Sequence, residues 1–133
     1  MSFDEVKVDV VILTCAASAG IHAALAPAHF AEGAGPGTGF VVAAVFLGAL
    51  AVALTRNPTQ RTLLVAVAVF TGLIVSYALV VAAGIPVVHP EREGVDTLAL
   101  FTKAVEAAGL VLAATLVRRP SPLLLLSPKG TLT

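Results

Sequence analysis

The 133-residue chain contains few charged residues, a single cysteine and no tryptophan. Asp, Glu, Lys and Arg together make up 12% of the residues, about half the share typical of soluble globular proteins. The lone cysteine excludes a disulfide-stapled fold, and the absence of a glycine repeat excludes a collagen-like one. Hydrophobic residues make up 58%, too large a share for a disordered chain. The composition therefore predicts an integral membrane protein.

Long intervals with little or no charge divide the chain into four parts. A helix needs about 20 mostly apolar residues to cross a hydrocarbon core about 30 Å thick. Four intervals of about this length lie between charged residues, and only the fourth contains charges, Lys103 and Glu106. Short connections make consecutive helices antiparallel neighbours, so residues 1–119 are predicted to form an all-α, four-transmembrane-helix bundle of up-down-up-down topology. The predicted helices cover residues 8–30, 38–55, 62–84 and 96–117.

The first apolar segment has a signal peptide as its alternative interpretation. A signal peptide would have a basic start and a shorter apolar region. Here the start is net acidic, with Asp4, Glu5, Lys7 and Asp9, so the segment is predicted to be a helix of the mature protein. Cys15 lies in this apolar segment without a second cysteine, and we expect it to be a small packing residue.

Lys and Arg are concentrated on the cytoplasmic side of membrane proteins, and this bias predicts the orientation. The second connection carries Arg56 and Arg61, and the segment after the fourth helix begins with Arg118 and Arg119. The third connection has Arg92 as its only base. We therefore expect a multi-pass protein of the plasma membrane with both termini in the cytoplasm. Residues 120–133 are predicted to be a cytoplasmic tail.

Small residues are expected to mediate packing between the helices, because lipid provides no hydrophobic drive for helix association. Three predicted helices carry sets of such residues: Ala16, Ala17, Ala19, Gly20 and Ala23; Ala44, Gly48 and Ala51; and Ala107, Ala108 and Gly109. They are assigned no chemistry.

Polar side chains inside a membrane are costly, about 2.5–3.5 kcal/mol for a charged residue on insertion scales, and they usually face the bundle interior. At 1.5 Å per residue, five of them fall about 10–15 Å below the outer surface: His22, Ser76, Tyr77, Lys103 and Glu106. Lys103 and Glu106 are three residues apart, so they lie on one helix face. One interpretation is an ion pair that only fixes helix register. The other is a ligand-binding polar pocket that opens outward.

A second group of polar residues lies closer to the outer surface. His29 and Glu32 close the first predicted helix, and His89 and Asp96 lie in or next to the third connection. Imidazole and carboxylate groups suit Zn²⁺ or Cu²⁺, which take nitrogen and oxygen donors at about 2.0–2.2 Å. These four residues are the candidate metal ligands, and exposed surface groups are the alternative. No HExxH motif, paired CxxC motif or methionine cluster supports the metal site.

Two stretches of the sequence are similar to a group of small four-helix membrane proteins from high-GC actinobacteria. The first is Gly20–Glu32, followed by an apolar helix from Gly39-Phe40. The second runs from Ala83 through Pro86, His89 and Asp96 to Lys103 and Glu106. The resemblance implies the four-helix topology and draws attention to the same polar residues, but it implies no activity.

Two hypotheses on function follow. The first is a membrane protein that binds a small ligand or a metal ion through an outward-facing His, Glu and Lys site. The second is a structural or accessory subunit that assembles with itself or within a larger membrane complex. The sequence has no catalytic motif, which argues against an enzyme without excluding one, and no basic patch for nucleic acid.

The topology is testable by cysteine labelling in intact cells. A cysteine placed at Gly35 should react with a membrane-impermeant reagent added outside, and one placed at Thr59 should not, because the arginine asymmetry places the second connection inside. The Cys15→Ser background removes the native thiol. The reverse labelling pattern would contradict an outward-facing site.

Overall fold

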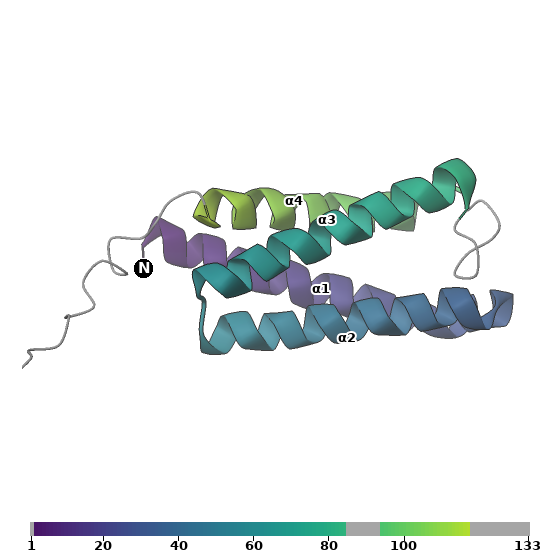
Figure 1. The fold of residues 1–133 in the computed structure, drawn as a ribbon, viewed down its shortest axis with the longest axis horizontal. Helices are drawn as coiled ribbons and strands as arrows, with labels where there is room; N and C mark the ends of the chain where they lie inside the picture. Colours follow the sequence, from purple (N-terminus) through teal and green to yellow (C-terminus); the bar gives the residue numbers. More distant parts are fainter. Residues whose placement is uncertain (1, 85–93, 118–133) are drawn as a thin grey trace, which may run out of the picture.

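The computed structural model describes residues 2–84 and 94–117, which form four helices and, within these ranges, no strand (Figure 1). The helices are α1 (Phe3–Glu32), α2 (Ala34–Arg56), α3 (Gln60–Ala83) and α4 (Thr97–Val117). Each of them is long and apolar enough to cross a membrane. The predicted third connection lies largely in residues 85–93, and the predicted tail in 120–133, both outside the described residues.

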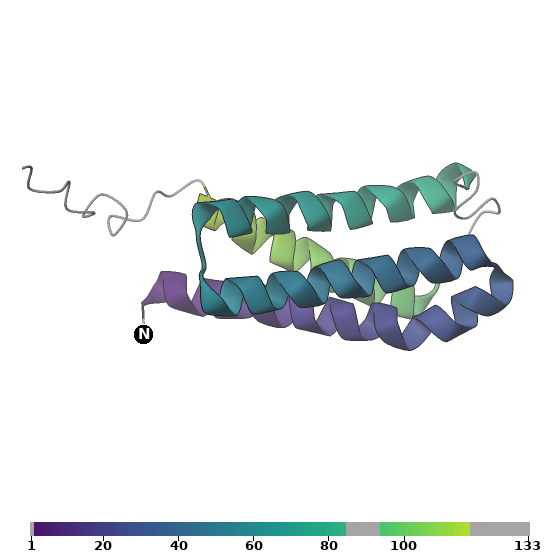
Figure 2. The same cartoon turned by 60° about the horizontal axis from the view of Figure 1, so that its bottom comes forward.

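The helices form the predicted up-down-up-down bundle. α1 packs against α2 and α4, and α3 packs against α4 and, least extensively, α2. The start of α1, the connection between α2 and α3, and the end of α4 lie at the same end of the bundle (Figures 1 and 2). This end carries Arg56 and Arg61 and corresponds to the side predicted to be cytoplasmic.

Two of the predicted helix starts were wrong. α1 begins at Phe3 instead of residue 8, because Ser2 and Glu5 form a capping box that satisfies backbone N–H groups of the first turn. α2 begins at Ala34 instead of residue 38, so the connection between α1 and α2 is Gly33 alone. Pro36 fits in the first turn of α2, where its missing N–H leaves no hydrogen bond unmade.

The prediction that small residues pack between helices was wrong for the first helix and, apart from the buried Gly109, for the fourth, where Ala107 and Ala108 are exposed. Ala16, Ala17, Gly20 and Ala23 are exposed on the outer face of α1, and only Ala19 is partly buried. The buried positions of α1 recur every three or four residues and lie on the other face: Val11, Cys15, Ser18, His22 and Ala26. Cys15 is thus a buried packing residue, as expected.

The apolar core fills one half of the bundle, at the end where α2 connects to α3. Its buried residues come from all four helices and are Val11, Cys15, Leu47, Leu50, Ala51, Leu54, Leu63, Ala66, Phe70, Ala113 and Leu116. Phe70 lies close to Gly109 of α4. A Cβ atom at Gly109 would lie 2.6 Å from Thr14 Oγ1 and 2.7 Å from the Phe70 ring, so α1, α3 and α4 meet closely only because residue 109 has no side chain.

Substitution of Gly109 tests this packing. Gly109→Ala should lower the melting temperature in detergent, because overpacking costs about 1–3 kcal/mol and exceeds the gain in helix propensity. Gly20→Ala is the matched control, since a Cβ atom at Gly20 meets nothing within 4 Å. That variant should be unchanged or slightly more stable. Equal effects of the two substitutions would contradict the close approach at Gly109.

Candidate functional site

A cavity of about 450 Å³ occupies the other half of the bundle. All four helices contribute to it: the second halves of α1 and α3 and the first halves of α2 and α4. Most of the wall is apolar, formed by Ile21, Leu25, Ala28, Pro36, Gly39, Phe40, Ala43, Leu73, Val80, Leu98 and Ala99. The polar residues in the wall are His22, His29, Ser76, Tyr77, Asp96, Thr102 and Lys103.

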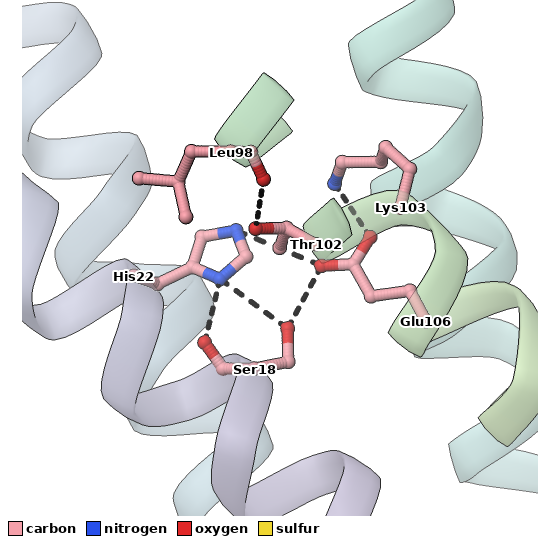
Figure 3. A network of polar contacts seen from close by, with 6 residues as sticks. All are labelled: Ser18, His22, Leu98, Thr102, Lys103 and Glu106. Atoms are coloured by element: carbon pink, nitrogen blue, oxygen red, sulfur yellow. Dashed lines mark hydrogen bonds and ion pairs between the residues drawn. The ribbon is translucent and has the colours of Figure 1, made fainter. Parts of the chain in front are cut away.

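Glu106 lies between the cavity and the apolar core, and its side chain is fully buried. Figure 3 shows its carboxylate held from two sides. Lys103 Nζ donates to Oε2 at 2.5 Å, and Ser18 Oγ, across the interface between α1 and α4, donates to Oε1 at 2.8 Å. The expected Lys103–Glu106 ion pair is therefore confirmed. A carboxylate in the membrane interior is compensated here by one ammonium and one hydroxyl group.

His22 lies on the face of α1 one turn beyond Ser18, and its imidazole contacts the same cluster. Nδ1 is 2.8 Å from the backbone oxygen of Ser18. A carbonyl oxygen only accepts hydrogen bonds, so Nδ1 carries a proton. In the neutral ring, Nε2 then holds the lone pair, and it lies 3.9 Å from Glu106 Oε1. A proton added at Nε2 would lie next to a carboxylate.

Aromatic rings surround the cavity beside this cluster. Lys103 Nζ lies 5.4 Å from the centroid of the Tyr77 ring, a cation–π contact between α4 and α3. The Phe40 ring of α2 lies 5.2 Å from the His22 ring and 3.8 Å from the His29 ring, measured between centroids. The cavity therefore combines an ammonium group with four planar side chains, two of them imidazoles.

The predicted metal ligands do not converge within the described residues. His29 Nδ1 lies 2.9 Å from Glu32 Oε2, one helical turn away. Asp96 is the N-cap of α4, where its Oδ1 accepts the Ala99 N–H at 2.7 Å. No group of three His, Cys, Asp or Glu side chains in residues 2–84 and 94–117 could hold a metal ion. His89, the remaining candidate, lies outside the described residues.

The structure brings together the polar residues that the sequence placed at one depth. His22, Ser76, Tyr77 and Lys103 line the cavity, and Glu106 lies behind Lys103. Ser76 is largely exposed, so it contributes to the edge of the cavity wall.

Sequence reasoning missed Ser18, the residue that connects α1 to the Glu106 carboxylate. The sequence contained one signal for it: Ser18 lies four residues before His22, and residues at this spacing share a helix face.

No family model matches the chain, and the searches of curated proteins and of solved structures find no match either. What can be inferred about function therefore comes from this geometry.

A double-mutant cycle tests the buried pair. Lys103→Met and Glu106→Gln alone should each destabilise the bundle, by about 3–5 kcal/mol where the remaining charge stays buried, because each change removes a partner. The double variant leaves no uncompensated charge and should lose less stability than the two single variants added together. Thermal unfolding in one detergent provides the comparison. Simple additivity of the two effects would show that the side chains are not paired.

Proposed function

We propose that this chain is a multi-pass protein of the plasma membrane, with both termini cytoplasmic, that binds a small molecule in the cavity between its helices. One observation carries the proposal: a cavity of about 450 Å³ has Lys103 and His22 in its wall and a fully buried Glu106 behind them. Known small-molecule sites have volumes of about 300–1,000 Å³ and mostly apolar walls with a few polar groups.

The energetic cost of the cluster also supports binding. Charged side chains within membranes usually mark a pathway or a binding site, because their insertion is unfavourable. Helix register alone could be fixed by packing, as it is at Gly109 in the other half of this bundle. A pair that served register alone would also need no cavity beside it, yet the Lys103 side chain lines one and is 18% exposed.

The alternative is a structural or accessory subunit without its own chemistry. The exposed face of α1 that carries Ala16, Gly20 and Ala23 favours it, because small residues allow close helix approach in lipid. In this case the chain would bury that face against a second copy or another membrane protein.

Native mass spectrometry separates the two functions. We expect the protein, purified in mild detergent, to retain a bound non-protein mass. Ala99→Phe should remove it by filling the cavity, since Ala99 lies in the wall. Ala104→Phe, on an exposed position of the same helix, should not. An oligomer without a bound non-protein mass in the wild type would contradict the proposal and support the subunit hypothesis.

A further inference from the structure

We infer that the occupant of the cavity is a neutral, lipid-soluble molecule with a planar ring head that carries carbonyl oxygens, of the quinone class. The inference rests on the proposed function, because it names the ligand of the same cavity.

The charges around the cavity favour a neutral head over an ionic one. The positive charge of Lys103 is compensated by Glu106, which lies 2.5 Å away, so the inner end of the cavity has no net charge to attract an anion. Asp96 in the wall adds negative charge at the other end of the cavity, which further disfavours anions. A cation at the inner end would have to compete with the Lys103 ammonium for Glu106, whose side chain is fully buried behind it. A neutral head avoids both penalties.

The donors in the wall require an acceptor on the ligand. Lys103 Nζ has three N–H groups, of which one points to Glu106, so the ammonium can donate to a ligand without leaving its partner. A carbonyl oxygen accepts such a bond and carries no charge. The rings of His22, His29, Phe40 and Tyr77 line the same space, and planar side chains stack favourably on a planar head.

The apolar wall and the helix packing point to entry from the bilayer. α2 and α3 touch least among the neighbouring pairs, and Figure 1 shows α3 diverging from α2 toward the cavity end. The wall on these two helices includes Gly39, Ala43 and Leu73, which present small or apolar groups. Since this side of a membrane-spanning bundle faces lipid, an apolar tail attached to the ring head can extend between α2 and α3.

The chain provides its own probe for the experiment. Tyr77 is the only tyrosine, the chain has no tryptophan, and the Tyr77 side chain lines the cavity. Quinones quench tyrosine emission at close range. Decylubiquinone, a quinone with a ten-carbon tail, is titrated into the purified full chain in detergent. We expect saturable quenching that Ala99→Phe abolishes and that Ala104→Phe leaves intact.

Two controls separate binding from partition into detergent. The double variant Tyr77→Phe/Phe46→Tyr moves the fluorophore to a position on α2 that is 60% exposed and outside the cavity, where quenching should rise linearly without saturation. The double variant Lys103→Met/Glu106→Gln removes the ammonium without stranding a charge. This variant should lower the apparent affinity for decylubiquinone about tenfold or more, because a hydrogen bond to a charged group is lost.

The outcomes distinguish this inference from the proposed function. Quenching without saturation in the wild type, or saturation unaffected by Lys103→Met/Glu106→Gln, overturns the quinone assignment. If native mass spectrometry still finds a bound molecule that Ala99→Phe removes, the proposed function stands with a different ligand. Competition by decyl phosphate and by decanol tests the charge of the head, because the two have the same tail and differ in charge. If decyl phosphate displaces decylubiquinone more strongly than decanol does, the assignment to a neutral head is also overturned.

Discussion

The buried carboxylate of Glu106 is the constraint on which the cavity half of this bundle depends. An uncompensated charge in a membrane interior is expensive, so the surrounding helices must supply partners at fixed positions. Lys103 supplies the charge from the same helix, and Ser18 supplies a hydroxyl donor from α1. The second contact sets the rotation of α1 against α4, because Ser18 must face Glu106. That rotation turns His22 into the bundle and places the alanine-rich face of α1 outside.

The bundle thus has two halves with different packing. Near the connection between α2 and α3, aliphatic side chains and Phe70 fill the interior, and Gly109 lets three helices come close. Beyond Glu106 the same helices enclose a cavity instead of a core. The tightly packed half can hold the helices in position, whereas the other half leaves space that close packing alone would fill.

Much of this arrangement was predictable from the positions of charged and polar residues along the sequence. Charge-free intervals gave the four helices, because the thickness of a membrane sets the length of a span. Counting 1.5 Å per residue placed Lys103, Glu106, His22 and Tyr77 at one depth, and the structure places all four at or behind one cavity wall. The start of α2 was not predicted, because glycine and proline near residue 36 usually indicate a loop, whereas the first turn of a helix tolerates both.

What the sequence by itself determined is the number of helices long enough to span a membrane, the common level of the polar residues and the Lys103–Glu106 pair, since each depends on distances along one chain segment. Only the tertiary structure decided which face of α1 is buried. An α1 with alanine on one side and Ser18 and His22 on the other offers two plausible packing faces, and lipid gives no hydrophobic preference between them. The need of Glu106 for a second donor favours the polar face, and this face places His22 in the cavity wall.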